Sequence, residues 1–205
     1  VSAGLIIPGG LSHGDLYHYA FITKGKTKAI SGDIGDYNAF VNSEAERLGA
    51  MTAGSPFGWK AIASTAAVDA RDNVDIQGRV FLIDGTQLAS SAGDMWDGSL
   101  AAPFNIDQFG DSVGLFTAPW TGSFSDGTGV PHFQLGGGFA SLFSKIGAAY
   151  GPGHLWSTVI PLPDWKKLPL YAVSDAIRFH DDNCEIPPEI PPTQPVPEPA
   201  SLAVW

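Results

Sequence analysis

The feature that most limits the fold of this chain is a proline-rich run near its C-terminal end. Between residues 185 and 199, seven of the fifteen residues are proline (EIPPEIPPTQPVPEP). Proline lacks a backbone N–H and fixes its own φ angle, so this run cannot lie inside a sheet and favours an extended polyproline II spacer. The folded part of the chain is therefore expected to end near Asn183.

The rest of the chain has the length of one domain with an arm before it. Residues 1–15 are a glycine-rich N-terminal arm, residues 16–183 suit a single domain, and residues 184–205 form the stalk. A hydrophobic content of 44% is enough for a substantial core, while 25 glycines and 16 prolines predict many turns and irregular loops.

The clearest regular element is a helix that begins after Asp33. The Asp33 side chain can cap the helix, Asp36 favours the positive end of the helix dipole, and Gly49 provides a stop. Apolar residues recur at spacings of three and four, which predicts one buried face and one polar face. The apolar face comprises Ile34, Tyr37, Val41, Ala45 and Leu48, and the opposite face carries Asn38, Asn42, Glu46 and Arg47.

Short strands are predicted around this helix. Residues 16–24, 59–63 and 79–83 are rich in β-branched and aromatic types, and residues 168–179 form the last candidate strand. Residues 94–143 are dominated by Gly, Asp, Ser and aromatic types, which predicts a long ordered loop region with short strands. The fold class is therefore α+β.

Charge restricts the partners. The net charge of −10 and the pI near 4.6 argue against nucleic acid and anionic membranes. No apolar run of 18 residues exists, so no membrane-spanning segment is predicted. The densest basic groups are Lys24, Lys26 and Lys28, and then Lys166 and Lys167, which are interpreted as solvated loop charges.

The single cysteine, Cys184, excludes an intramolecular disulfide bond. A free thiol is favoured, with an intermolecular bridge beside the stalk as the alternative. The chain opens with Val1 rather than Met, which suits a processed N-terminus after removal of a signal peptide, although any other boundary would look the same.

The end of the chain resembles a known sorting signal. Pro197, Glu198 and Pro199 are followed by the apolar residues 200–205 (ASLAVW), and together they resemble the start of a PEP-CTERM signal. In that family an apolar helix and a basic tip follow the Pro-Glu-Pro motif, and an exosortase system acts on the signal at the envelope. Here the apolar segment is short and the basic tip is absent. The resemblance implies export to the cell surface or extracellular matrix.

The body of the chain, from about Tyr19 to Phe179, resembles bacterial C-type-lectin-like domains of the endostatin-like branch. The segments that carry the resemblance are DIGDYNAFVNSEAERLG, WKAIAST, DARDN, VFLIDGTQLA, DMWDGSLAAPFNID, WTGSFSDGTG and LYAVSDAIRF. The resemblance implies two small antiparallel sheets, helices of which one is clear from the sequence, and a long loop region. Related sequences often carry cysteines near the loop region and last strand, where this chain has Ala, Val or Ser.

The resemblance raises calcium and sugar binding. Sugar-binding C-type lectins use a Glu-Pro-Asn or Gln-Pro-Asp triplet and a Trp-Asn-Asp triplet, and this chain has neither. Oxygen side chains do gather in the loop region, but such residues also stabilise turns, so no calcium ligand is assigned. These residues are Asp94, Asp97, Asn105, Asp107 and Asp126.

Tryptophans allow two interpretations. Trp96, Trp120 and Trp156 can stack on sugar rings, but aromatic side chains are also the main apolar material of a loop-rich core, which is favoured. The resemblance places Trp59 and Trp96 in the core.

No catalytic residue is predicted. The chain has no Gly-x-Ser-x-Gly elbow, no phosphate-binding glycine loop and no zinc-protease motif. The histidines are scattered, and His180 with Asp181 and Asp182 is the one local metal-like cluster, at the junction with the stalk. No cofactor is assigned, and the chain is expected not to be an enzyme.

The sequence favours a structural or adhesive protein of the cell surface or matrix that self-associates. The apolar segment Leu5, Ile6 and Ile7, or the stalk, is expected to dock on a neighbouring copy, for example by adding to a strand edge, and to build fibres. One alternative is a glycan-binding, lectin-like module whose partner is an extracellular polysaccharide. A more remote alternative is a hydrolase of extracellular polymers, which needs a carboxylate pair in a cleft.

Overall fold

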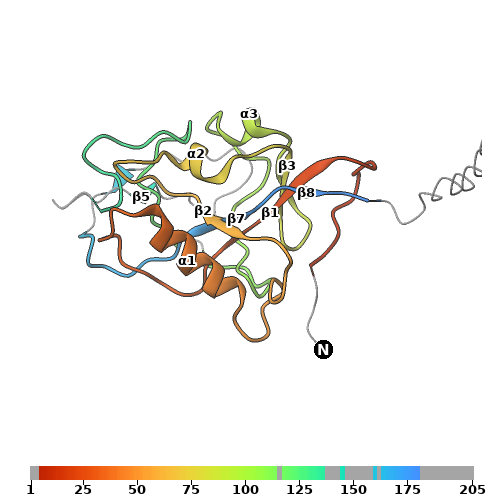
Figure 1. The fold of residues 1–205 in the computed structure, drawn as a ribbon, viewed down its shortest axis with the longest axis horizontal. Helices are drawn as coiled ribbons and strands as arrows, with labels where there is room; N and C mark the ends of the chain where they lie inside the picture. Colours follow the sequence, from red (N-terminus) through yellow and green to blue (C-terminus); the bar gives the residue numbers. More distant parts are fainter. Residues whose placement is uncertain (1–4, 115–116, 137–143, 146–158, 161–162, 181–205) are drawn as a thin grey trace, which may run out of the picture.

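The computed structural model describes residues 5–114, 117–136, 144–145, 159–160 and 163–180 (Figure 1). These residues form an α+β fold on one main sheet with few helices, in agreement with the predicted fold class. The predicted stalk at residues 184–205, with its Pro197, Glu198 and Pro199 motif and Cys184, lies outside the described residues.

The main sheet contains six strands in the order β2-β7-β1-β3-β4, with β8 paired to the start of β1. The strands are β1 (Leu16–Ile22), β2 (Trp59–Ala61), β3 (Arg79–Leu82), β4 (Gln87–Ala89), β7 (Tyr171–Ser174) and β8 (Ile177–Arg178). The first and last long strands, β1 and β7, are antiparallel neighbours, so the two ends of the domain are held together.

The prediction of two small antiparallel sheets is wrong for the main sheet. Strands β1 and β3 run parallel, with Tyr17 opposite Arg79 and Ala20 opposite Leu82. A parallel pair needs a long crossover connection, which α1, β2 and α2 supply here. The second pair, β5 (Ser144–Lys145) and β6 (Val159–Ile160), is antiparallel.

The predicted helix is confirmed as α1 (Ile34–Ala45). Asp33 caps it, because its Oδ1 atom accepts a hydrogen bond from the Gly35 N–H at 2.8 Å. The helix ends before Leu48, which is fully exposed, so the prediction that Leu48 belongs to the buried face is wrong. Two short helices that the sequence did not reveal, α2 (Ala70–Val74) and α3 (Ala92–Met95), follow.

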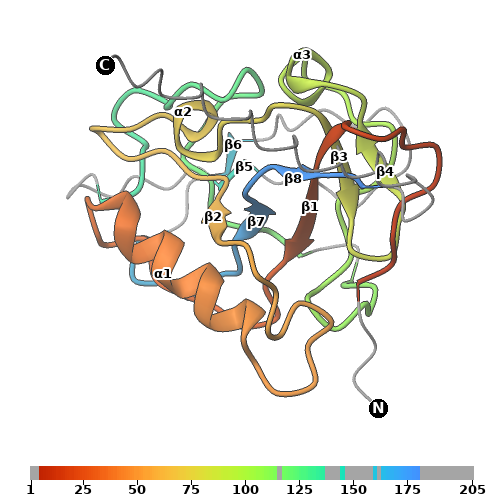
Figure 2. The ribbon, with the colours of Figure 1, turned by 45° about the vertical axis from the view of Figure 1, so that its right-hand side comes forward.

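Both faces of the sheet are covered, and strand alternation assigns the residues of β1 to them. Tyr19 and Phe21 belong to the core cluster that contains Tyr37 and Val41 of α1. Ile22, on the other face, belongs to the cluster formed with α2 and α3. Figure 2 shows α1 and α3 on opposite sides of the strands. Full burial of each large apolar side chain contributes roughly 2 kcal/mol to folding, so the two clusters account for most of the stability.

The sheet edge at β2 is closed by asparagine side chains. The Asn42 Oδ1 atom accepts from the Trp59 N–H at 3.0 Å, and the Asn42 Nδ2 atom donates to the Trp59 carbonyl at 2.6 Å. Asn38 accepts from the Ala61 N–H, and Asn73 of α2 donates to the Ala61 carbonyl, both at 2.8 Å. Asn38 and Asn42, which the sequence placed opposite the apolar face of the helix, therefore bind the β2 edge.

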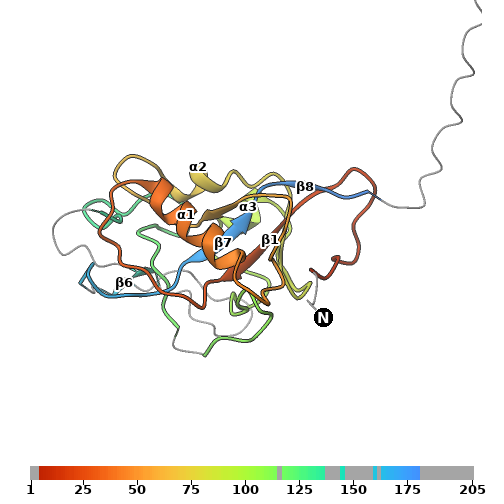
Figure 3. The ribbon, with the colours of Figure 1, turned by 60° about the horizontal axis from the view of Figure 1, so that its bottom comes forward.

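The N-terminal arm is attached to its own domain. Leu5 packs against the core, the Tyr19 hydroxyl donates to the Ile6 carbonyl at 3.0 Å, and Arg79 donates to the Gly10 carbonyl at 2.6 Å. The Gly14 N–H also donates to the Phe179 carbonyl, beyond β8, at 2.9 Å. The arm and the end of β8 consequently lie at one end of the molecule, as Figures 1 and 3 show.

Candidate functional site

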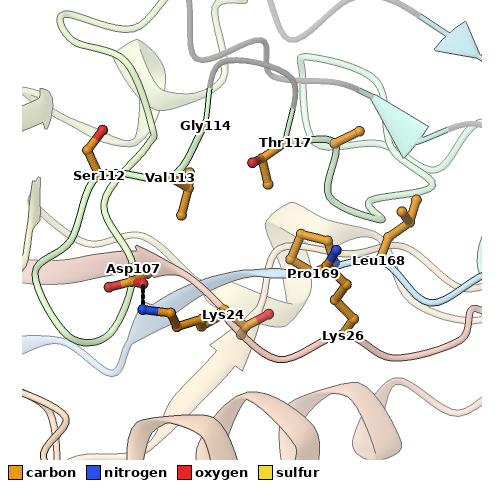
Figure 4. Close-up of a pocket in the computed structure, with 11 residues that line it drawn as sticks. Lys24, Lys26, Asp107, Ser112, Val113, Gly114, Thr117, Leu168 and Pro169 are labelled. Carbon is orange, nitrogen blue, oxygen red and sulfur yellow. Dashed lines mark ion pairs between the residues drawn. The ribbon is translucent and has the colours of Figure 1, made fainter.

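A pocket of about 370 Å³ lies beyond the end of β1, between residues 105–114 and 117–118 on one side and residues 168–169 on the other (Figure 4). Both polar and apolar side chains line it. They belong to Thr23, Lys24, Lys26, Asp107, Ser112, Val113, Thr117, Ala118, Leu168 and Pro169.

An ion pair controls the electrostatics of this pocket. The Lys24 ammonium lies 3.3 Å from Asp107 Oδ2 and 3.2 Å from Asp111 Oδ2. Hydrogen bonds to Asp111 and Asp107 raise the pKa of Lys24 above its usual value. The ammonium group therefore stays charged at neutral pH and pairs with both carboxylates.

Asp107 is held rigidly in this arrangement. The residue is 1% exposed, and its Oδ1 atom accepts from the Phe109 N–H at 2.9 Å and the Asp111 N–H at 3.0 Å. A buried carboxylate needs such partners, because burial without them is strongly unfavourable. The loop is thus shaped around the Asp107 side chain.

A buried polar network connects the loop to α1. The Gln108 amide accepts from the Lys24 N–H and donates to Glu44 Oε2, both at 2.8 Å. The same Glu44 oxygen accepts from the Gly25 N–H at 2.7 Å, and Arg47 pairs with Glu44 Oε1 at 3.1 Å. Helix α1 therefore fixes the position of the chain on either side of Lys24.

The pocket offers two ammonium groups, three hydroxyl groups and an apolar wall. Thr23, Ser112 and Thr117 supply the hydroxyl groups, while Val113 and Pro169 supply apolar surface. Such a lining suits binding of a small polar molecule with apolar faces, such as a sugar. Lys24 is not suited to act as a nucleophile, because nucleophilic amines need a lowered pKa.

A second hollow of about 360 Å³ lies on the neighbouring surface. Lys26 lines both hollows, so they adjoin at this residue. Lys28, Lys167 and Asp36 also line the second hollow, with Ile30, Thr27, Ser31 and Tyr37 completing it.

The sequence left the oxygen side chains of the loop region open between stabilising turns and binding calcium. In the structure, three of them form turn hydrogen bonds. Asp94 accepts from Ser90, Asp97 accepts from the Ser99 N–H at 2.8 Å, and Asp126 accepts from Thr128. Only Asp107 lines the pocket, and Asn105 donates to the nearby Ser112 hydroxyl at 3.3 Å. Hydrogen bonds from the Ser90 N–H and hydroxyl lower the pKa of Asp94.

The tryptophans divide between core and surface. Trp59 and Trp120 are buried in the core, which agrees with the favoured interpretation for both. Trp96 is half-buried and packs against the core cluster formed with α2 and α3, and Trp156 lies outside the described residues. Trp165, which the sequence did not single out, is 62% exposed in a turn next to Lys166.

One histidine has a structural role that the sequence did not reveal. His18 is buried in β1, its Nδ1 atom lies 2.9 Å from the Ser174 carbonyl, and its Nε2 atom accepts from the Gln77 N–H at 3.0 Å. The available sequence signal was its position inside a strand segment of apolar and aromatic residues. His180 is exposed against His13, while Asp181 and Asp182 lie outside the described residues.

No group of three or more His, Cys, Asp or Glu side chains with metal-binding geometry occurs in the described part of the chain. None of the helices there has the length and apolar character required to cross a membrane.

The candidate self-association segment is partly exposed. Leu5 contacts the core, but Ile6 is 49% exposed and Ile7 is 70% exposed. An apolar pair thus remains at the surface of an arm whose backbone is fixed by Tyr19.

The sequence matches no family model, and no curated protein is similar to it.

Proposed function

We propose that the chain is an exported, non-enzymatic structural or adhesive protein of the cell surface or extracellular matrix, built on a C-type-lectin-like domain. The observation that carries the proposal is that its potentially reactive side chains are engaged in hydrogen bonds and ion pairs within the domain. Lys24 is ion-paired, His18 is bound through both ring nitrogens, and the Asp107 carboxylate organises a loop. Side chains that resemble catalytic groups are thus occupied by structural contacts.

The C-type-lectin-like assignment is supported by where its carrier segments lie. The segment DIGDYNAFVNSEAERLG contains α1, and the first three residues of WKAIAST form β2. The segment VFLIDG contains the last three residues of β3, and LYAVSDAIRF contains β7 and β8. All of these segments contribute buried residues to the two core clusters. The resemblance therefore concerns residues that determine the fold rather than the variable surface.

Self-association is proposed to involve apolar side chains of the arm rather than addition of a strand. The β2 edge is occupied by Asn38, Asn42 and Asn73, and at the β4 edge the Leu88 carbonyl accepts from the Ala101 N–H at 2.9 Å. Ile6 and Ile7 together provide an exposed apolar surface for a neighbouring copy. If that contact is head-to-tail, it propagates into a fibre.

Export is tested in intact cells that express the natural gene. A protease added outside the cells is expected to digest the protein, whereas a cytoplasmic marker protein survives. Replacement of Pro197, Glu198 and Pro199 by alanine is expected to change the processing or release of the protein. Complete protection of the wild-type protein until the cells are lysed would contradict the proposal.

Glycan binding is the second candidate function, favoured by the mixed lining of the pocket at Lys24. A glycan array with and without a calcium chelator separates it from a purely structural role. Binding lost with Lys24→Gln and retained with Lys60→Gln would assign the sugar to this pocket.

A further inference from the structure

Three lysines share one face of a short antiparallel ribbon. Thr27 and Leu168 exchange backbone hydrogen bonds of 2.8 and 2.9 Å. In an antiparallel pair this register places Lys28 directly opposite Lys167, and Lys26 lies on the same side as Lys28 because side chains alternate. All three line the hollow of about 360 Å³, which independently places them on one surface.

The ribbon is held in place by a buried tryptophan. Trp120 is 0% exposed, its Nε1–H donates to the Thr27 carbonyl at 3.1 Å, and its backbone N–H donates to the Pro169 carbonyl at 2.9 Å. Both sides of the ribbon are therefore fixed to the core. Because the backbone that carries these lysines is already fixed, their side chains can bind a ligand without the entropy cost of ordering a loop.

No ion pair among the described residues involves any of the three ammonium groups, which is also true of Lys60, Lys166 and Arg178. Lys24, Arg47 and Arg79 each pair with a carboxylate, but no described carboxylate forms an ion pair with Lys26, Lys28 or Lys167. Like charges directly opposite each other destabilise an antiparallel pair. An anion between these lysines would relieve that repulsion.

Two carboxylates lie near the ribbon and offset part of its charge. Asp36 lines the hollow, where its Oδ2 atom accepts from the Ser31 hydroxyl at 2.6 Å. Both Asp36 and Asp164 contribute, after burial, to the raised pKa of Tyr37, which also lines the hollow. Three ammonium groups against two carboxylates leave one net positive charge here, on a protein whose net charge is −10.

We propose that Lys26, Lys28 and Lys167 bind the carboxylates of an acidic polysaccharide. The hollow has the size of a site for a small ring-shaped ligand, and Trp165 provides an exposed aromatic face in the adjoining turn. Duplex DNA carries about one negative charge per 1.7 Å of its axis, so the net charge of −10 opposes it more strongly than it opposes a polysaccharide with one carboxylate per sugar.

The inference rests on the proposed function in one respect, since the protein must be exported to encounter an extracellular acidic polysaccharide. Its test is independent of that function, because binding is measured on purified protein. A failure of export or of self-association would leave the binding result unaffected.

The test is a titration of the purified full chain with polygalacturonate, followed by biolayer interferometry at low and high salt. The triple variant Lys26→Gln, Lys28→Gln and Lys167→Gln removes the site. A control triple variant, Lys60→Gln, Arg71→Gln and Arg178→Gln, removes the same charge elsewhere on the domain.

Polygalacturonate is expected to bind the wild type and the control, and to bind the site variant about ten-fold more weakly, with a smaller salt dependence. Neutral dextran and duplex DNA are expected to bind weakly. Equal loss of affinity in both triple variants would show a general charge effect and overturn the proposal. Equal binding by the wild type and the site variant, or tighter binding of DNA, would overturn it as well.

Discussion

The Asn42 side chain forms the two hydrogen bonds with the Trp59 backbone that a neighbouring strand would form. Its side-chain amide accepts from the Trp59 N–H at 3.0 Å and donates to the Trp59 carbonyl at 2.6 Å. An exposed edge strand is a template for pairing with other chains, and the side chain of α1 occupies that template. The helix thus contributes to the sheet through a polar side chain as well as through its apolar face.

Replacement of Asn42 by leucine is expected to lower the free energy of unfolding by about 3 kcal/mol, because it leaves both Trp59 backbone groups without partners. Urea unfolding measures this change. The control Ser43→Ala, at an exposed neighbour whose hydroxyl donates only to the Phe40 carbonyl, is expected to change stability little. A loss below about 1 kcal/mol for Asn42→Leu would show that water replaces the amide.

Gly25→Ala is expected to destabilise the domain by about 2 kcal/mol. A Cβ atom at position 25 would overlap the Glu44 carboxylate, which is buried and bound to Gln108. Moving that carboxylate breaks its hydrogen bonds. Thermal unfolding measures the effect, and Gly9→Ala is the control because a Cβ atom at position 9 would have no neighbouring atom within 4 Å. Equal stability of the two variants would contradict the claim that the hydrogen bonds of Glu44 stabilise the domain.

Stability is expected to fall as the pH drops below about 6.5, the usual pKa of histidine. Burial lowers the pKa of His18 in the folded state, although the Ser174 carbonyl opposes this effect. The unfolded chain then binds a proton before the folded domain does, so protonation favours unfolding. The stabilisation that comes from neutral His18 is fully present above pH 6.5, and it is lost as the pH falls towards the pKa of His18 in the folded state.

Urea unfolding at several pH values measures this slope, which is expected to approach about 1 kcal/mol per pH unit. His18→Gln is expected to reduce the slope, and His180→Gln, at an exposed site, is expected to leave it unchanged. An unchanged slope in His18→Gln would assign the acid sensitivity to other groups.

Lys28→Gln is expected to raise the midpoint of thermal unfolding by about 1 °C in the absence of ligand, because it removes repulsion from Lys167. Differential scanning calorimetry measures the shift, and Lys60→Gln is the control. The gain is expected to disappear when polygalacturonate is present. A lower midpoint for Lys28→Gln would show that the two lysines do not repel each other.

Local signals in the sequence predicted the elements but not their pairing. The cap at Asp33 and the apolar spacing through Ala45 predicted α1, and the residue types around Tyr19 predicted β1. The parallel pairing of β1 with β3 was not predictable, because it joins residues about 60 positions apart and leaves no local pattern.

The candidate sites depended even more on long-range contacts. Lys28 and Lys167 looked like separate loop charges, and only the Thr27–Leu168 bridge brings them together. The sequence placed Asn42 on the polar face of the helix, but it does not show that β2 runs beside α1 and receives the Asn42 side chain. The half-burial of Trp96 likewise depends on tertiary packing rather than on residue type.

Self-association is the central claim of the proposed function, and side-chain variants test it better than truncation. Removal of residues 1–12 would also remove Leu5 and Leu11, which pack against the core, and would confuse unfolding with loss of assembly. The double variant Ile6→Ser and Ile7→Ser changes the exposed apolar surface and leaves Leu5 and Leu11 in place. Leu48→Ser, at a fully exposed leucine elsewhere, is the matched control.

The most direct measurement is sizing chromatography with light scattering on the purified full chain, combined with negative-stain microscopy. The wild type and Leu48→Ser are expected to form large oligomers or filaments, and the Ile6→Ser, Ile7→Ser variant is expected to elute as a folded monomer. A wild-type protein that remains monomeric at every concentration would contradict self-association, and undiminished filaments from the double variant would contradict the role of the arm.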